Sequence, residues 1–309
     1  MKYNFDISYV ITTKNEEKNL TNLLSSIVNQ KKNLFSYEII VIDNKSTDKT
    51  KEISLSFGCK FFDVEKDSDV RNYQRNLGLI EKSQGKYLFW LDADMILSSN
   101  LTFECYEKLE KNRNIKGLYI PEVILGKDLF TISRRFERFY YNNTPIDGLR
   151  FFERKAFTEI GGFTQSWMHG PDDWDLDIRF KEKYRTDIIN TKIDFFFDND
   201  LKKKVQQGLY KNYLDYPTCI FHNETKISIN KFIQKKSHYY NDFDLYIKRW
   251  GKEHPALKKQ LSLYYRTFKI FFRSKDLSIK TLKNSHFYIL FLVIRFYIFF
   301  KLFLKIKIK

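Results

Sequence analysis

Apolar runs and helical patterns alternate along the first 125 residues. Five runs rich in β-branched and aromatic side chains predict strands at 7–12, 38–42, 59–62, 87–91 and 117–123. The segments between them predict helices at 20–27, from the turn at 43–48 to about 57, at 71–82 and at 101–111. Some of the predicted strands are apolar at nearly every position, as strands are when helices cover both faces. This alternation predicts an α/β fold with a mainly parallel, Rossmann-like sheet and helices on both faces.

The pattern changes after residue 127. A further strand is predicted at 149–152, followed by a helix at 153–160 that the Gly-Gly-Phe segment at 161–163 ends. Another helix is predicted to begin at Asp172. The chain shows no internal repeat and no long low-complexity linker.

Three polar motifs follow predicted strands, at 12–16, 43–48 and 92–94. In a parallel sheet the ligand lies beyond the carboxyl ends of the strands, so we expect these motifs to share one site. Asp92 and Asp94 directly follow an apolar strand, and such a pair can hold a divalent cation with the ribose or diphosphate attached to it. An Asp-x-Asp pair alone is weak evidence, because many surface turns carry one. Its place at a strand end is what favours a Mn²⁺ or Mg²⁺ site.

A second acidic cluster begins the helix predicted from residue 172. Its members are Asp172, Asp173, Asp175 and Asp177. Acids in the first turn of a helix are stabilised by the helix dipole, so capping is one interpretation. Four acids in six residues exceed what capping needs. We therefore favour the other interpretation, in which one carboxylate is a general base for a sugar hydroxyl.

Together these motifs resemble those of the family 2 glycosyltransferases, the inverting enzymes of the GT-A fold. The matching segments stand in the family's order and spacing, and they cover roughly residues 5–225. They are 10–16 (VITTKNE), 40–48 (IVIDNKSTD), 75–78 (RNLG), 85–94 (GKYLFWLDAD), 161–163 (GGF) and 172–176 (DDWDL). The resemblance implies a GT-A catalytic domain at 1–225, with a nucleotide-sugar-binding half at 1–125 and an acceptor half at 126–225.

The resemblance also implies roles for single residues. The positions where the family binds the nucleotide-sugar donor fall on Thr12, Asn15, Glu16, Asp43, Arg71, Arg75 and Asp92. Asp94 is expected to ligate the metal directly, with Asp92 near the metal and the ribose. The catalytic base falls on Asp173. The family's acceptor motif is usually Glu-Asp, whereas this chain has Asp172 before the base.

Four further side chains have two interpretations each. His222 lies where related enzymes sometimes supply a histidine near the metal or diphosphate, and the alternative is a loop histidine without such a role. Trp167, His169 and Trp174 lie just before or within the acidic cluster, where they line an acceptor pocket or only pack.

Four arginines, Arg134, Arg135, Arg138 and Arg150, lie among aromatic residues in the second half of the chain. They either bind a phosphate of the acceptor or form a solvated basic face. The solvated face is the interpretation that we favour.

The net charge of +16 is concentrated near the C-terminus. Residues 256–309 contain thirteen Lys or Arg and one acid, a balance of +12, which leaves +4 for the rest of the chain. Arg266, Lys269 and Arg273 fall at i, i+3 and i+7, which predicts one basic stripe on a helix whose other faces are aromatic.

The apolar segment that begins at Phe287 is interrupted by Arg295 before it reaches the roughly 18–20 residues of a membrane span. We therefore predict that 226–309 forms a helical, basic and aromatic extension that associates with an anionic membrane surface. A tilted single span, and a helix packed on the main domain, are the alternatives.

The predicted function is metal-dependent, inverting transfer of a sugar from a nucleotide sugar to an acceptor hydroxyl, on a lipid-linked or cell-surface glycan precursor. A non-catalytic nucleotide-sugar or carbohydrate-binding protein is one alternative, against which the acids at 92, 94 and 173 argue. A nucleotidyltransferase is another, but it would usually need a Gly-rich phosphate loop, and the sequence has none. Nucleic acid is not expected as a partner, because the positive charge lies in an apolar, aromatic tail.

The cysteines and the N-terminus indicate the compartment. Cys59, Cys105 and Cys219 are odd in number and far apart, which predicts three buried thiols in a reducing environment. The first residues contain no apolar stretch of signal-peptide length. We therefore expect a cytoplasmic protein that associates with the membrane through its C-terminal region.

Overall fold

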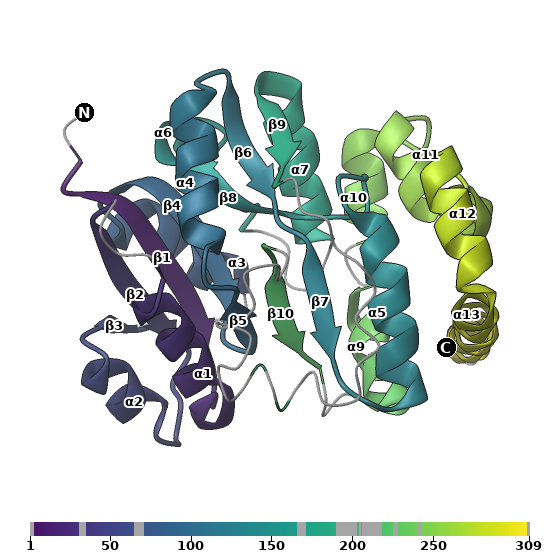
Figure 1. Cartoon of the computed structure of the whole chain (residues 1–309), viewed down its shortest axis with the longest axis horizontal. Helices are drawn as coiled ribbons and strands as arrows, with labels where there is room; N and C mark the ends of the chain where they lie inside the picture. Colours follow the sequence, from purple (N-terminus) through teal and green to yellow (C-terminus); the bar gives the residue numbers. More distant parts are fainter. Residues whose placement is uncertain are drawn as a thin grey trace.

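A computed structural model describes residues 3–30, 35–64, 71–165, 171–189, 203, 205, 218–224, 228–239 and 243–307. A seven-stranded sheet forms its centre (Figure 1). In spatial order the strands are β3 (Lys60–Asp63), β2 (Tyr37–Asp43), β1 (Phe5–Thr13), β4 (Gly85–Asp92), β8 (Leu149–Glu153), β6 (Ile115–Tyr119) and β9 (Arg185–Ile188). Only β8 runs antiparallel to its neighbours. The mainly parallel sheet that the sequence predicts is thus confirmed.

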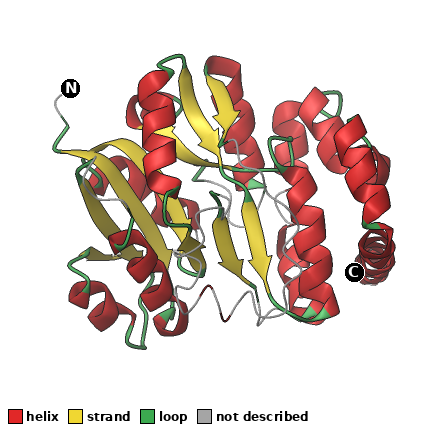
Figure 2. Cartoon of the chain, viewed as in Figure 1, coloured by secondary structure: helices red, strands yellow, loops and turns green. Residues whose placement is uncertain are grey.

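Helices cover both faces of this sheet, as predicted (Figure 2). One face packs against α1 (Glu17–Val28), α2 (Thr50–Ser56) and α4 (Leu101–Lys111). The other packs against α3 (Arg71–Asn76), the π-helical segment η1 (Leu77–Lys82), α6 (Arg154–Glu159) and α7 (Asp172–Lys183). Successive side chains of β1 alternate between the two cores, with Tyr9 and Ile11 in one and Val10 in the other. Both faces are therefore buried, which is why these strands read as continuous apolar runs.

The single strand predicted at 117–123 is wrong, because the run divides between two sheets. Its first part is β6, and its second part is β7 (Glu122–Leu125). A smaller sheet contains β7 together with β5 (Met95–Leu97) and β10 (Ile220–Asn223). Pro121 lies at the break, where it has no amide proton for a ladder and its carbonyl accepts a hydrogen bond from Ile220 N at 2.9 Å.

The sequence assigned no element to the segment that forms α5 (Leu129–Tyr141). The Asp128 side chain caps this helix by accepting a hydrogen bond from Thr131 N. The buried face of α5 carries Phe130, Phe136 and Tyr140, but it also carries the buried Arg135. The segment is strongly amphipathic all the same, and this pattern indicates a helix that was not predicted.

A helical extension follows the last strand, as predicted. Its elements are α9 (Ile229–Tyr239), α10 (Phe243–Trp250), α11 (Pro255–Leu261), the π-helical η4 (Tyr265–Lys269), α12 (Lys275–Lys283) and α13 (Ser285–Lys307). It lies along α5, at the side of the molecule opposite β3 (Figure 1). Phe136 of α5 shares a buried cluster with Phe271 and Phe291 of the extension. The boundary at residue 225 stays a prediction.

The predicted basic stripe of Arg266, Lys269 and Arg273 is wrong. Arg266 lines a cavity. Arg273, although exposed, donates to the carbonyls of Tyr140 and Asn142 at 3.0 and 3.2 Å, and Lys269 is exposed. The helix does not continue through this segment, since η4 ends at Lys269 and α12 begins six residues later. Positions i, i+3 and i+7 therefore do not share one face.

In the part of the chain that the structure describes, no single helix is long and apolar enough to cross a membrane. α12 and α13 as far as Lys301 meet the criteria together, but they are bent by 87° at the break between them. The three cysteines are free and buried, as predicted.

Candidate active site

The carboxyl ends of β1, β2 and β4 meet at one edge of the sheet, where the three polar motifs were expected. Thr12 is paired in register with Asp92, and Thr13 with Asp43. The side chain of Gln74, on α3, donates to the carbonyls of Thr13 and Ile42 at 3.0 and 2.6 Å. Gln74 thus connects the two strand ends, a role that was not predicted from the sequence.

Two of the predicted donor-side residues hold the loops at this edge in place. The Asp43 carboxylate is buried and accepts hydrogen bonds from Thr13 Oγ1, Ser46 Oγ and Ser46 N, all at 2.6 Å. Asn15 has a positive φ of 57°, and its side chain accepts a hydrogen bond from Thr47 N at 2.8 Å. The nucleoside contacts of Asn15 and Asp43 stay predictions.

Glu16 lies near the Asp-x-Asp motif. Burial raises the pKa of its carboxyl, and the charges of Asp94 and Asp92 raise it further, although a hydrogen bond from Asn19 opposes the shift. The carboxylates that follow β1 and β4 are therefore close enough to interact electrostatically.

Two guanidinium groups flank Asp92. Its Oδ2 lies 3.2 Å from Nη1 of Arg150, and its Oδ1 lies 4.0 Å from Nη2 of Arg75. Burial opposes ionisation of Asp92, but these two arginines outweigh it and lower the pKa to about 2. Both arginines pack on the buried indole of Trp90, with Cζ 4.1 and 4.2 Å from its ring centroid. Trp90 therefore positions the cations on either side of the motif.

His222 lies between Asp94 and Glu122, on strand β10 rather than in a loop. Its Nε2 is 3.2 Å from Asp94 Oδ1, and its Nδ1 is 3.4 Å from Glu122 Oε2. Burial opposes charge on the imidazole, but Asp94 and Glu122 raise its pKa well above the ordinary value. Pairing of His222 with Met95 across β10 and β5 sets this position. A metal-binding role for His222 stays a prediction.

Glu122 is a residue of the site that the sequence analysis missed. It is buried on β7, and its Oε1 lies 2.9 Å from Nη2 of Arg138 and 3.1 Å from Nη2 of Arg150. Burial would raise the pKa of this carboxyl, but the two arginines hold it well below its usual range. A lone glutamate in a predicted strand carries no signal of this role, because its partners are distant in sequence.

The first turn of α7 brings Asp172 and Asp173 to the same site. Nη1 of Arg75 lies 2.7 Å from Asp172 Oδ2 and 3.5 Å from Asp173 Oδ1, and Nη2 of Arg71 lies 3.7 Å from Asp172 Oδ2. No described residue donates a hydrogen bond to Asp173 Oδ1. Desolvation and the neighbouring Asp172 raise the pKa of Asp173, against the opposing charges of Arg75 and Arg150. Asp173 therefore keeps a lone pair that can accept a proton.

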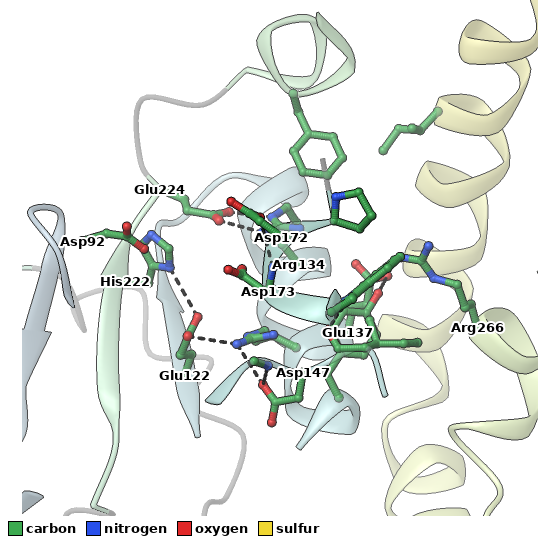
Figure 3. Close-up of a pocket in the computed structure, with 18 of the residues that line it drawn as sticks. Asp92, Glu122, Arg134, Glu137, Asp147, Asp172, Asp173, His222, Glu224 and Arg266 are labelled. Atoms are coloured by element: carbon green, nitrogen blue, oxygen red, sulfur yellow. Dashed lines mark hydrogen bonds and ion pairs between the residues drawn. The ribbon is translucent and has the colours of Figure 1, made fainter. Parts of the chain in front are cut away.

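A cavity of about 420 Å³ is lined by Asp92, Glu122, Asp172, Asp173 and His222. Figure 3 shows Asp92 and His222 at one side of it, Asp172 and Asp173 near its middle and Arg266 at the other side. Trp174 also lines the cavity, and its Nε1 donates to the Ile146 carbonyl at 3.1 Å. The other two predicted acceptor-side residues, Trp167 and His169, lie outside the described residues.

The solvated basic face expected of the four arginines is wrong. Arg134 forms two hydrogen bonds with Glu224, and Arg138 pairs with Glu122 and Asp147. Arg150 pairs with Asp92 and Glu122, and Arg135 donates to the backbone carbonyls of Ile124 and Gly126. Each guanidinium is largely removed from water. The partners come from β4, from β7 and the loop after it, from the residue after β10 and from the loop before β8. Such partners are not visible in a linear sequence.

The carboxylates of Asp92 and Asp94 fit a divalent cation that the substrate helps to bind. The described residues contain no group of three His, Cys, Asp or Glu side chains able to hold a metal ion alone. Mg²⁺ and Mn²⁺ are commonly held by one or two carboxylates and complete their shell with substrate phosphates. Both side chains are about one third exposed, so a diphosphate can reach them.

The middle strand of the large sheet thus ends in an Asp-x-Asp motif, and an acidic helix N-terminus faces it across a cavity. These features define a transferase of the GT-A fold. The sequence model described as Glycosyl transferase family 2 matches residues 8–164, just over half of the chain. The chain therefore belongs to glycosyl transferase family 2, as its motifs had predicted.

Similar curated proteins include three named glycosyltransferases or synthases. A dolichyl N-acetyl-α-D-glucosaminyl phosphate 3-β-D-2,3-diacetamido-2,3-dideoxy-β-D-glucuronosyltransferase of Methanococcus voltae is 28% identical over 75% of this chain and 71% of its own length. The poly(ribitol-phosphate) β-N-acetylglucosaminyltransferase TarP of Staphylococcus aureus is 28% identical over 39% of this chain and 41% of its own. The β-monoglucosyldiacylglycerol synthase of a Nostoc species is 21% identical over 70% of this chain and 52% of its own. The chain thus spans less than two thirds of two of these three relatives.

Solved structures share the fold. The mannosyltransferase PcManGT of Pyrobaculum calidifontis, in complex with GDP-Man and Mn²⁺, has a TM-score of 0.56 at 16% identity, over 92% of this chain and 76% of its own. The TarS protein of S. aureus, residues 1–349 with UDP-GlcNAc, has a TM-score of 0.52 at 15% identity, over 92% and 78%. At these identities the likeness shows the fold alone.

Proposed function

We propose that this glycosyltransferase moves a sugar from a nucleotide-sugar donor to an acceptor hydroxyl with inversion at the anomeric carbon. One observation carries the proposal: a single buried guanidinium, that of Arg75, lies within 4.0 Å of both Asp92 and Asp173. The strand end that would receive the donor and the carboxylate that would activate the acceptor therefore belong to one cavity. A one-step displacement needs both reactants bound in such a shared space.

Asp173 is the proposed general base. It takes the proton of the acceptor hydroxyl, whose oxygen forms a bond to the anomeric carbon as the bond from that carbon to the diphosphate breaks. Arg75 positions Asp173 and Asp172. Arg71, whose side chain is 40% exposed, stabilises the negative charge of the departing nucleoside diphosphate.

The donor would lie at the ends of β1, β2 and β4, against Thr12, Asn15, Glu16 and Asp43. Asp94 and Asp92, assisted by His222, would hold Mn²⁺ or Mg²⁺ there. When bound, the cation neutralises charge on the diphosphate. The Mn²⁺ and GDP-Man of PcManGT and the UDP-GlcNAc of TarS support a donor and cation of this kind.

The proposed acceptor is a lipid-linked glycan precursor, presented at an anionic membrane surface on the cytoplasmic side. The dolichyl phosphate and diacylglycerol groups in the names of two relatives support this class. The outer face of α13 supports the membrane surface: Ile289, Val293, Phe296 and Phe300 follow helical spacing and are 50–62% exposed. Exposed Lys301 directly follows this apolar stripe on α13.

The test is a screen of nucleotide sugars by thermal shift with Mn²⁺, followed by nucleotide release in the presence of candidate acceptors. Binding of the correct donor raises the midpoint of unfolding. Asp94→Ala should abolish release while the fold survives, because it removes one oxygen ligand at a surface turn. The control is Asp63→Ala, an equally small change at an exposed aspartate at the end of β3. Wild-type turnover of Asp94→Ala in saturating Mn²⁺ would overturn the metal assignment.

A further inference from the structure

The cavity that contains Asp173 continues as far as the C-terminal extension. On that side its wall consists of Arg266 from η4, Arg295, Ile298 and Phe299 from α13, and Leu261 and Leu263 around the end of α11. We refer to these six residues as the extension wall. Figure 3 shows Arg266 reaching from this side toward Glu137 of α5. The extension is therefore part of the pocket in which the acceptor would lie.

The charges near the extension wall do not cancel. Arg134 is matched by Glu224 at 2.5 Å, and Arg295 is matched by Glu137 at 3.1 Å. Arg266 is a third guanidinium, and its charge also acts on Glu137. It interacts with Tyr141, but no described group accepts a hydrogen bond from its buried Nε. An orphaned donor on a cation in a cavity is a position that an anionic ligand would satisfy.

Trp174 lies close to this cation in the cavity. The Arg266 guanidinium lies 5.9 Å from the centre of the Trp174 ring, and Trp174 directly follows Asp173. The ring is held by its hydrogen bond to the Ile146 carbonyl. Trp174 therefore lines the same cavity as Asp173 and Arg266, next to the base in sequence and close to the cation.

Beyond Arg266 the wall becomes apolar and open. Leu261, Leu263 and Phe299 line the cavity and are 40–51% exposed at the same time. Next to Phe299 on α13 lies the exposed stripe that ends with Phe300. The cavity wall thus combines a carboxylate, a guanidinium and an apolar rim.

We propose that Arg266 binds the phosphate through which the acceptor sugar is joined to its apolar carrier, with the carrier leaving over Leu261, Leu263 and Phe299. This inference rests on the proposed function, since it assigns the outer end of the same acceptor pocket. It names a phosphate ester carrying an apolar chain as the group that is recognised. A neutral glycolipid lacks the partner that Arg266 requires.

The experiment measures binding of octyl phosphate, below its micelle concentration, to the full chain by isothermal titration calorimetry. Donor, metal and turnover are absent, so a failure here is distinct from a failure of the transferase proposal. Arg266→Gln should weaken binding at least about tenfold, since a charge-assisted contact is lost. Arg266→Lys should restore part of the affinity. Lys269→Gln, the same change of charge on an exposed residue three positions away, should leave it within about twofold.

Three further ligands decide the source of the phosphate and the role of the rim. Octyl glucoside, with the chain but no charge, should bind equally weakly to wild type and Arg266→Gln. Inorganic phosphate should bind more weakly than octyl phosphate. Equal binding would show that the apolar rim does not contact the carrier chain. Phosphatidylglycerol vesicles should bind Arg266→Gln as they bind wild type, and a selective loss would make Arg266 a bilayer contact instead. Unchanged octyl phosphate affinity in a folded Arg266→Gln protein, judged by its unfolding midpoint, would overturn the proposal itself.

Discussion

Among single residues, Asp173 is the one on which the proposed mechanism depends most directly, because it accepts the proton of the acceptor hydroxyl. Asp173→Asn keeps the shape of the side chain and removes the proton acceptor. We expect it to lower the transfer rate by at least about 10²-fold with donor affinity nearly unchanged, as measured by kcat and by calorimetric titration of the donor. Arg75 still has Asp172 as its partner in this variant, at 2.7 Å, so the fold should persist.

The same carboxylate sets the pH dependence. The pKa of Asp173 is raised above the ordinary value of 3.8, and the base acts only when deprotonated. Transfer should therefore fall as the pH decreases through this raised pKa, and the acidic limb of the wild-type pH profile should be absent from the residual activity of Asp173→Asn. A product with retained anomeric configuration, or an unchanged acidic limb in the variant, would contradict the mechanism.

Glu122 is predicted to matter for stability. Glu122→Gln leaves Arg138 and Arg150 without the carboxylate that lies within 3.1 Å of both. Removal of one partner from a buried ion pair typically costs about 3–5 kcal/mol. Because Arg138 keeps Asp147 and Arg150 keeps Asp92 as partners, we expect a loss at or below the lower end of this range in the free energy of unfolding in urea. The control, Glu107→Gln, removes an exposed i,i+4 pair with Lys111 and should cost less than about 0.5 kcal/mol. Equal effects of the two changes would refute a structural role for the Glu122 cluster.

Among the elements, α13 has two faces with different functions. Phe291 is 1% exposed and packs against α5 through Phe271 and Phe136, whereas Val293 is 62% exposed on the outer face. Phe291→Ala should reduce the free energy of unfolding by about 3–5 kcal/mol, because it opens a cavity in a buried cluster. Val293→Ser should leave stability within about 0.5 kcal/mol and reduce binding to anionic vesicles.

The pair of changes separates packing from membrane contact, because the two residues are one helical half-turn apart. Urea unfolding and vesicle sedimentation are measured on both variants. If Val293→Ser is destabilised as much as Phe291→Ala, the outer face is covered by the protein itself. If Val293→Ser binds vesicles like the wild type, this face does not contact lipid.

For the whole molecule, we predict association with anionic liposomes that weakens at high salt without vanishing. The +12 charge of residues 256–309 contributes electrostatically to the free energy of membrane binding, by about 1 kcal/mol for each basic residue near the surface. Salt screens this contribution. The exposed apolar stripe of α13 contributes to the same free energy through burial of apolar surface, which salt does not screen. Sedimentation of the full chain at low and high salt measures both, and full-length protein that stays in the supernatant under both conditions would refute the prediction.

Truncation is a poor test of the same idea. A chain that ends at residue 255 loses Tyr265, Phe271 and Phe291, which complete the buried cluster on Phe136 and Tyr140. We expect that fragment to aggregate, because the uncovered face of α5 is largely aromatic. A soluble, monomeric fragment in size-exclusion chromatography would show instead that the catalytic part folds without residues 256–309.

The sequence by itself determined the class of fold and the edge of the sheet where the site lies. Strand ends of a parallel sheet converge whatever the details of packing, so motifs that follow β1, β2 and β4 had to meet. Strands buried on both faces are apolar throughout, which is a local signal. The family motifs added Asp173, which the first turn of α7 brings to the same cavity.

Only the tertiary structure decided which charges are buried and which side chains line the pocket. The partners Arg150 and Glu122, Arg134 and Glu224, and Arg295 and Glu137 are distant in the chain, so each reads as an exposed charge when taken alone. The same holds for the predicted basic stripe, which a break after Lys269 disperses. Burial of a charged residue depends on a partner that long-range packing supplies, and no local pattern encodes that partner.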